Sequence, residues 1–282
     1  MLKVSFGAKV VRVLIVIFVI ALIIIALYPM FWMVTTSFKT YEESLAWPPT
    51  LLPQRFIWDN YVQIFRMANI HRFFANSVLY AVVGTFFSVL FATMGGYAFA
   101  KLHFKGKRLL FFIVLSVLMI PHQVTLIPVF LINAWLGWVD TYLGLIVPGV
   151  INAFGIFLIR QFAMGIPDAL FDAARIDGAR EVRIFRSIFL PVVIPPVTTL
   201  IVLEFMTRWN DMFWPLIIIN SANRRPLTLA LTVLYSSEWA GVVRWPQMAA
   251  AMTIAALPVL ILYAMFQKYF TGGLVITSGV KE

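Results

Sequence analysis

The chain has 282 residues, of which 62% are hydrophobic and only 12% are charged. Soluble globular domains have about 45–50% apolar and about 25% charged residues, so this composition excludes a water-soluble protein and favours lipid as the solvent. The formal net charge is +10, but no compact basic stripe with interleaved aromatics is present, which argues against nucleic-acid binding. The absence of cysteine excludes disulfides and thiolate sites.

Apolar runs divide the chain into six candidate membrane spans. A helix needs about 20 apolar residues to cross the hydrocarbon core of a bilayer. The sequence predicts spans at about 13–34, 76–100, 109–131, 141–160, 192–212 and 246–268, of which the fifth is interrupted by Glu204. The first run is longer than the core of a signal peptide and no small-residue cleavage site follows it, so we expect a retained helix.

Basic residues are unevenly shared between the two sets of connecting segments. Fourteen of the 22 Lys and Arg residues lie before the first span, between spans two and three, between spans four and five, or after the last span. Because basic residues are enriched on the cytoplasmic side, both termini are expected there and segments 35–72 and 213–244 outside. Residues 1–12 would form a cytoplasmic N-terminus and residues 13–282 a single transmembrane domain.

A long, patterned connection, 163–191, joins the fourth and fifth spans. Pro167 suits the first position of a helix, and Asp168 complements the positive end of the helix dipole. Asp177-Gly178 is a turn signal, because glycine tolerates a positive φ. We therefore predict two short helices joined by a sharp bend on the cytoplasmic side, with Pro191 at the start of the fifth span.

The second of these helices is predicted to be amphipathic. Apolar residues recur at helical spacing on one face and polar residues on another: Val182, Phe185, Ile188 and Phe189, against Arg180, Arg183 and Ser187. Such a bent pair of helices is suited to insertion into a cleft on another protein. The alternative is an interfacial connector that touches only lipid headgroups.

The same segment resembles the signature loop of ABC importer permeases. That signature has Glu-Ala-Ala, two residues, Asp-Gly-Ala, a Phe and then Leu-Pro. This chain has Asp172-Ala173-Ala174, Asp177-Gly178-Ala179, Phe185 and Leu190-Pro191 at the same spacing. The one departure is Asp172 for the usual Glu, which keeps the charge on a shorter side chain. We call residues 167–191 the signature loop.

The resemblance extends along nearly the whole chain and is strongest to the sugar-importing, maltose-like branch of that family. The matching segments are Tyr28-Pro29 with Trp32, Ser37-Phe38-Lys39, Asn76-Ser77, Gly96-Tyr97-Ala98, Phe104-Lys105-Gly106-Lys107-Arg108, Met119-Ile120-Pro121 through Pro128, Asp140-Thr141-Tyr142-Leu143-Gly144-Leu145, Trp209-Asn210, Trp214-Pro215-Leu216, and Gly272-Gly273 with Gly279-Val280-Lys281. The resemblance implies an all-α integral membrane protein with six transmembrane helices, the type I ABC importer permease fold and a location in a prokaryotic inner or plasma membrane.

The family resemblance also implies how such a chain works. A second, homologous permease subunit would complete the translocation path within the lipid, and an extracytoplasmic binding protein would deliver a sugar or oligosaccharide. Two ATPase subunits would bind ATP and Mg on the cytoplasmic side. The signature loop would dock on one of them, with Asp172 paired to a basic group there and Gly178 supplying the bend.

The chain itself lacks the motifs of an enzyme. It has no Gly-x-x-x-x-Gly-Lys-Ser/Thr phosphate loop, no His-Glu-x-x-His metal motif and no Gly-x-Ser-x-Gly nucleophile motif. We therefore expect no catalytic residue, no bound cofactor and no metal ion on this chain. ATP hydrolysis would belong to the partner.

Polar residues near the fifth span are candidates for the path. Glu204 and Arg208 lie four residues apart, so they are expected either to pair with each other or to contact substrate or the partner permease. Trp209 and Asn210 suit the ring face and hydroxyls of a sugar. His122 either borders the path or packs between helices.

Three questions stay open at this level. The solute is expected to be a sugar, with a glycerophosphate-type ester or another polar solute as the alternative, and the main site can lie on the partner permease. Segment 213–244 either contacts the binding protein or is a solvated loop. An ion-coupled secondary transporter is a weaker alternative, because membrane-embedded ionisable groups gather at only one span, and the specific loop argues against a passive scaffold.

Overall fold

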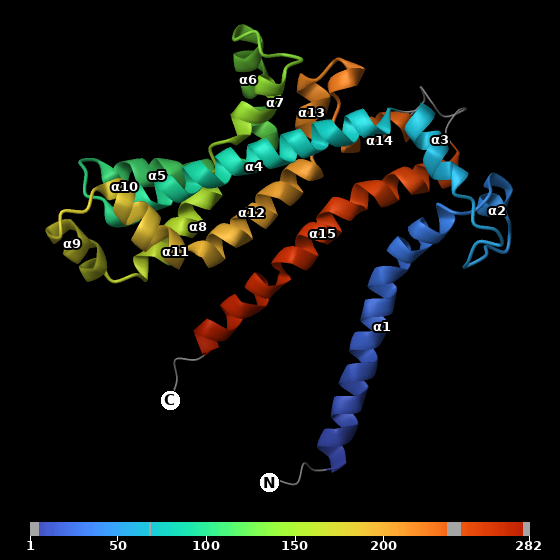
Figure 1. Ribbon diagram of the computed structural model, residues 1–282, viewed down its shortest axis with the longest axis horizontal. Helices are drawn as coiled ribbons and strands as arrows, with labels where there is room; N and C mark the ends of the chain where they lie inside the picture. Colours follow the sequence, from blue (N-terminus) through green and yellow to red (C-terminus); the bar gives the residue numbers. More distant parts are fainter. Residues whose placement is uncertain (1–5, 68, 236–243, 279–282) are drawn as a thin grey trace. The chain divides into compact units, whose positions relative to one another are not determined.

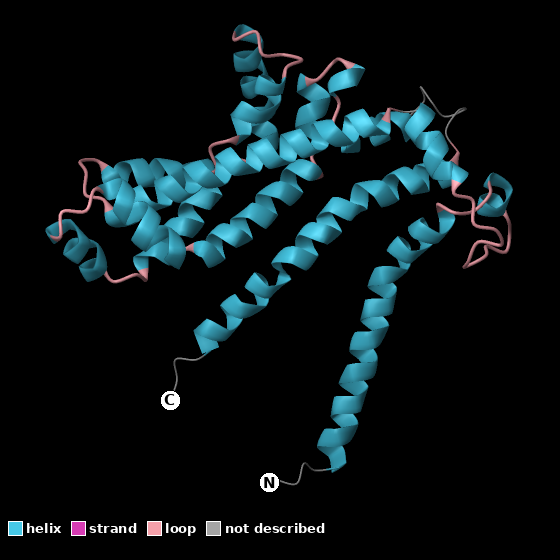
Figure 2. Ribbon diagram, viewed as in Figure 1, coloured by secondary structure: helices cyan, strands magenta, loops and turns pink. Residues whose placement is uncertain are grey.

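The computed structural model describes residues 6–67, 69–235 and 244–278, and every regular element in these ranges is helical. Figure 2 shows the absence of strands there, and Figure 1 labels the helices. They are α1 (Phe6–Thr36), α2 (Tyr41–Leu45), α3 (Asp59–Met67), α4 (Ile70–Lys101), α5 (Lys107–Val117), α6 (His122–Trp135), α7 (Tyr142–Ile146), η1 (Val147–Gly149), α8 (Ala153–Met164), α9 (Asp168–Ile176), α10 (Glu181–Ile184), η2 (Phe185–Phe189), α11 (Leu190–Val192), α12 (Ile194–Trp209), α13 (Phe213–Ile218), η3 (Ala222–Arg224), α14 (Leu227–Tyr235) and α15 (Trp245–Ser278). The predicted all-α class is confirmed.

Four stretches of helix are long and apolar enough to cross a membrane: Val11–Thr36, Ile70–Lys101, Tyr142–Met164 and Trp245–Gln267. Two bent pairs bring the number to six if each pair counts as one span. Lys107–Val117 meets His122–Trp135 at 104°, and Glu181–Val192 meets Ile194–Trp209 at 80°.

Proline explains where both pairs bend. Pro121 precedes α6, and Pro195 and Pro196 open α12, so backbone hydrogen bonds are missing at each break. The fifth predicted span was expected to start at 192, next to Pro191. Instead Pro191 lies inside α11, the chain breaks at Val193, and α12 ends at Trp209.

The chain forms two compact units, one of residues 1–70 with 233–256 and one of residues 71–232 with 257–282. In the first unit, the segment after α1 is held by buried polar groups. Lys39 donates from Nζ to the Thr50 carbonyl and lies 4.3 Å from the Trp32 ring centroid. Asn60 donates to the carbonyls of Ser37 and Lys39 at 2.9 Å. These contacts fix the turn between α1 and α3.

In the second unit, α4, α8 and α12 pack closely through small residues. A Cβ placed on Gly155 would lie 2.8 Å from the Ala92 Cβ and 2.9 Å from a Leu200 methyl group. Association between membrane helices depends on such close packing, because lipid tails are as apolar as leucine. Small residues therefore set how near these three helices approach.

The start of α4 is joined to the segments around residues 140 and 220–225. Asn76 donates from Nδ2 to the carbonyls of Asn223 and Arg225 at 2.9 and 3.0 Å, and the Ser77 hydroxyl accepts from the Leu227 amide. Asp140 accepts from the Ser221 amide at 3.0 Å. Residues that match the family at distant places in the sequence thus meet at one end of the unit. Residues 236–243 of segment 213–244, like 1–5 and 279–282, lie outside the described residues.

Asp140 is stabilised as a carboxylate. Partial burial raises its pKa, but hydrogen bonds from the hydroxyl and amide of Ser221 and the amide of Asn220, together with the Arg224 guanidinium, lower the pKa by more. The net direction is below the ordinary value, so this carboxylate holds the 220–225 segment at neutral pH.

The close packing of α4 on α8 is testable at Gly96. A Cβ added there would meet the Ile159 side chain at 2.5 Å, so Gly96→Ala should destabilise the protein by about 1–3 kcal/mol. Gly165→Ala is the matched control, because its nearest contact would be an ordinary 3.4 Å. The midpoint of heat-induced aggregation in detergent, followed by size-exclusion chromatography, should fall for Gly96→Ala only. Equal midpoints would contradict the packing.

Candidate functional site

The bend of the signature loop is a helix-ending motif built on glycine. Gly178 has a φ of 78°, which costs a residue with a side chain about 1–2 kcal/mol. The Ala179 amide donates to the Ala174 carbonyl at 2.9 Å, and the Gly178 amide to the Arg175 carbonyl at 3.0 Å. This pair of bonds is a Schellman motif. The Asp-Gly-Ala part of the signature therefore ends α9 and turns the chain into α10.

The second half of the loop differs from the predicted amphipathic helix. After α10 the chain makes a π-helical turn, η2, whose wider turn shifts the side-chain register. Phe189 is fully buried, as is Ile184 of α10, whereas Val182, expected on the same face as Phe189, is 64% exposed. Pro167 was expected inside the first helix but lies one residue before it.

Tyr97 of α4 is the aromatic contact that the loop packs on. Its ring centroid lies 4.8 Å from that of Phe189, 5.4 Å from Phe185 and 6.3 Å from Phe171. These rings come from both halves of the loop, so one side chain of α4 holds α9 and η2 together. The Tyr97 hydroxyl also donates to Glu181 Oε2.

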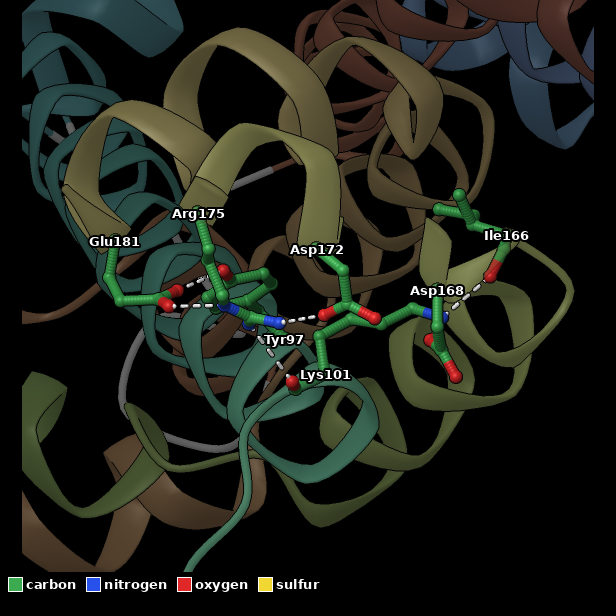
Figure 3. A network of polar contacts seen from close by, with 7 residues as sticks. All are labelled: Tyr97, Lys101, Ile166, Asp168, Asp172, Arg175 and Glu181. Carbon is green, nitrogen blue, oxygen red and sulfur yellow. Dashed lines mark hydrogen bonds and ion pairs between the residues drawn. The ribbon is translucent and has the colours of Figure 1, made fainter. Parts of the chain in front are cut away.

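Lys101, in the last turn of α4, anchors the start of α9 (Figure 3). Its side chain is only 3% exposed, and Nζ donates at 2.6 Å to both the Ile166 carbonyl and Asp168 Oδ1. The hydrogen bond and charge of Lys101 lower the pKa of Asp168 below its ordinary value. The Asp168 carboxylate is therefore charged at neutral pH.

Arg175 closes the bend from the α9 side. Its Nη1 donates to Asp172 Oδ1 at 2.9 Å, its Nε to Glu181 Oε1 at 2.8 Å, and its Nη2 to the Lys101 carbonyl at 3.2 Å. Figure 3 shows these bonds converging from α4, α9 and α10. We call Tyr97, Lys101, Asp168, Arg175 and Glu181 the loop clamp.

None of the predicted signature residues belongs to the loop clamp, and all of them are exposed or half-buried. The Asp172 side chain is 63% exposed while bonded to Arg175. Asp177, Gly178 and Ala179 border a cavity of about 350 Å³ on the loop, together with Ala174 and other residues. The Ala173 carbonyl accepts a hydrogen bond from the Asp177 amide. Phe185 is half-buried and Pro191 is exposed.

Sequence reasoning did not identify the clamp itself. Lys101 was counted only as an orienting charge, and Tyr97 only as part of a matching segment. The local signal that was present is the basic residue in the last turn of α4, where the helix dipole favours a cation. Nothing local, however, indicates which distant acid it meets.

The structure brings Glu204 and Arg208 together inside the second unit. Glu204 Oε2 lies 3.0 Å from Arg208 Nη1 and accepts from the Ser88 hydroxyl at 2.7 Å. Asn152 donates to the other carboxylate oxygen, and Arg208 Nη2 donates to the Gly149 carbonyl. Both charged side chains are buried, so these bonds are what makes their burial tolerable.

Trp209, Asn210 and His122 do not gather at one site. Trp209 is buried, stacked on Phe205 and edge-on to Phe74, with centroids 5.6 Å apart in each case. Asn210 is exposed and donates to the Met206 carbonyl. His122 borders a cavity whose lining also includes Arg208 but neither Trp209 nor Asn210.

The chain matches a known family of membrane proteins. The family model described as "Binding-protein-dependent transport system inner membrane component" covers residues 84–274. The chain belongs to this family. As a member, it is a multi-pass transport subunit of the inner membrane rather than an enzyme.

Curated relatives and a solved structure agree with this assignment. The permease is 34% identical over 260 residues to the arabinooligosaccharides transport system permease protein AraQ of Halalkalibacterium halodurans, covering 91% of this chain and 92% of that one. It is 30% identical over 259 residues to the sn-glycerol-3-phosphate transport system permease protein UgpE of Pectobacterium atrosepticum, covering 90% and 92%. A chain of a bacterial ABC transporter that imports the acidic polysaccharide alginate has a TM-score of 0.86, with 25% identity and coverage of 96% and 100%.

The permease clamp is testable by hydrogen exchange. Lys101→Met leaves the Ile166 carbonyl and Asp168 without their buried partner, and a hydrogen bond to a charged group contributes about 1.5–3 kcal/mol. Amides of α9 should therefore exchange about tenfold or more faster, as measured by mass spectrometry. Lys105→Met, at an exposed lysine, is the control and should leave α9 unchanged. Unchanged α9 exchange in Lys101→Met would show that the clamp does not hold the loop.

Proposed function

We propose that the chain forms half of the translocation path of an ATP-driven sugar importer and that its signature loop docks on a separate ATPase. The observation that carries the proposal is the packing of the loop, which buries one set of its apolar side chains against the protein and leaves another set exposed. Phe171, Ile184 and Phe189 are buried against the unit, whereas the apolar side chains of Ile176 and Val182 are exposed. Exposed apolar groups on a rigid bend suit a socket in a partner protein better than water.

Orientation follows from the distribution of basic residues. The positive-inside rule places the signature loop and both termini in the cytoplasm, and segments 35–72 and 213–244 outside. A cytoplasmic loop is accessible to an ATPase that binds ATP and Mg. The segment at 220–225, held by Asp140 and Asn76, then faces the side from which a binding protein delivers solute.

The proposed assembly has four kinds of component besides lipid. This permease and a second, homologous permease enclose the path, two ATPase subunits bind the signature loops, and a solute-binding protein docks outside. ATP binding would bring the ATPases together and pull the loop. Because the loop clamp ties α9 and α10 to α4, the pull reaches the membrane helices and alternates access to the path.

The proposed solute is a sugar or an oligosaccharide. Relatives named for arabinooligosaccharides and lactose support this class. The second candidate is a glycerophosphate-type ester, favoured by the similarity to UgpE. Such sugars are neutral and glycerophosphate esters are anionic, so the charges that line a binding cavity on this chain favour one class over the other.

Purification of the complex tests the proposal. The tagged chain, expressed in its source cells and extracted in mild detergent, should bring down a protein with a Gly-x-x-x-x-Gly-Lys-Ser/Thr motif and a second multi-span chain. Asp172→Ala should lower recovery of the ATPase or ATP-driven uptake about tenfold, because an exposed charge on the docking face is lost. Asp59→Ala, at an exposed aspartate of α3, is the control. Transport by the chain alone, or full coupling in Asp172→Ala, would refute the proposal.

A further inference from the structure

A cavity with both polar and apolar lining lies in the second unit at the far end of α4 from the signature loop. Its volume is about 330 Å³, and α4, α6, α12 and α13 border it with the segments that join them. Its polar and aromatic lining includes Tyr80, His122, Thr125, Arg208, Asp211 and Trp214. Tyr80 and Lys101 are separated by about 30 Å of helix, at 1.5 Å per residue. The cavity is therefore remote from the loop clamp.

The positive charge in the lining is already neutralised. Arg208 is paired with Glu204 at 3.0 Å, and its Nη2 donates to the Gly149 carbonyl. Its Nε has no hydrogen-bond partner among the described residues and faces α4, where a Cβ on Gly84 would lie 2.3 Å away. The guanidinium group is thus enclosed by protein atoms, and no pair of its N–H groups is available for bidentate binding of an anionic ligand.

The negative charge of Asp211 is not neutralised. Its Oδ2 accepts from the Tyr80 hydroxyl at 2.9 Å and its Oδ1 from the Trp214 amide at 3.3 Å. No lysine or arginine pairs with it within the part of the chain that the structure describes. A carboxylate in this state accepts further hydrogen bonds from hydroxyl groups and repels phosphate and carboxylate ligands.

The remaining lining suits a sugar ring. The Trp214 ring is fixed, because its Nε1 donates to the Gly144 carbonyl at 3.1 Å, and it offers an apolar surface. The His122 imidazole makes no hydrogen bond to the described residues and can donate or accept one. Ligand pockets typically measure about 300–1,000 Å³, so this one is large enough for one sugar unit and too small for a long chain.

We propose that this cavity binds one neutral sugar unit of the solute during translocation, with Asp211 and His122 as its hydrogen-bonding groups. The proposal rests on the proposed function and narrows it. The site lies on this chain, and its charge excludes glycerol phosphates and acidic sugars. Trp209 and Asn210, expected from the sequence to contact solute, lie outside the lining.

A labelling experiment tests the site without requiring transport. The natural chain has no cysteine, so Thr125→Cys places a single thiol in the cavity, and Thr232→Cys on α14 provides an exposed control outside it. The complex, purified with its partners, is treated with a small hydrophilic methanethiosulfonate. The probes are lactose, maltotriose and arabinotriose, with glycerol 3-phosphate for comparison.

At least one neutral sugar should slow labelling of Thr125→Cys, by about tenfold at ten times its Kd. Glycerol 3-phosphate should have no effect, and Thr232→Cys should be labelled at the same rate throughout. In the Thr125→Cys background, Asp211→Asn keeps the size of the side chain but removes its charge. It should weaken protection by the sugar about tenfold and allow glycerol 3-phosphate to protect.

The outcomes separate the site from the importer. If no neutral sugar protects Thr125→Cys, or if glycerol 3-phosphate protects it equally, the site is overturned, whatever uptake shows. Protection that Asp211→Asn leaves unaltered, in a variant that still assembles, also overturns it. If a sugar protects but ATP-driven uptake fails in vesicles, the proposed function fails and the cavity stands as a sugar site.

Discussion

One buried ammonium group, that of Lys101, sets the arrangement of the signature loop. A charge removed from water is costly unless it is paired and hydrogen-bonded. Lys101 meets this requirement with the Ile166 carbonyl and the Asp168 carboxylate, and its Nζ lies 5.0 Å from the Phe171 ring centroid. Detaching α9 from α4 would leave the charge without partners. The first half of the loop is therefore held to the end of a long membrane helix.

Other buried polar contacts extend this rigidity along α4. Ser88 joins α4 to Glu204 of α12, and Asn152 joins the same carboxylate to the N-terminus of α8. Further along, Tyr80 donates to Asp211 in the wall of the cavity. On the proposed function, a displacement of the loop would be transmitted to the cavity by a helix with bonded groups at both ends and in the middle. Coupling over about 30 Å then needs no flexible intermediate.

The sequence predicted what local patterns determine. Apolar runs indicated the helical class and the regions of the spans, and Asp177-Gly178 marked the bend that a Schellman motif forms. It did not predict the break at Val193, the π-helical turn, or that Phe189 is buried while Val182 is exposed. The clamp and the cavity were missed because they depend on contacts between residues far apart in the sequence, such as Lys101–Ile166, 65 positions apart, and Tyr80–Asp211, 131 positions apart. Such pairings depend on how helices pack, which periodicity does not encode.

The central claim is that the signature loop and α4 move as one body. Spin labels on Leu170→Cys and Val82→Cys, both at exposed positions of a cysteine-free chain, measure it by pulsed electron paramagnetic resonance in the assembled complex. Rigid coupling predicts one narrow distance distribution with the same mean in the nucleotide-free and ATP-trapped complexes. A shift of several ångströms between the two states, well beyond ordinary side-chain motion of about 1 Å, or a broad distribution, would contradict it.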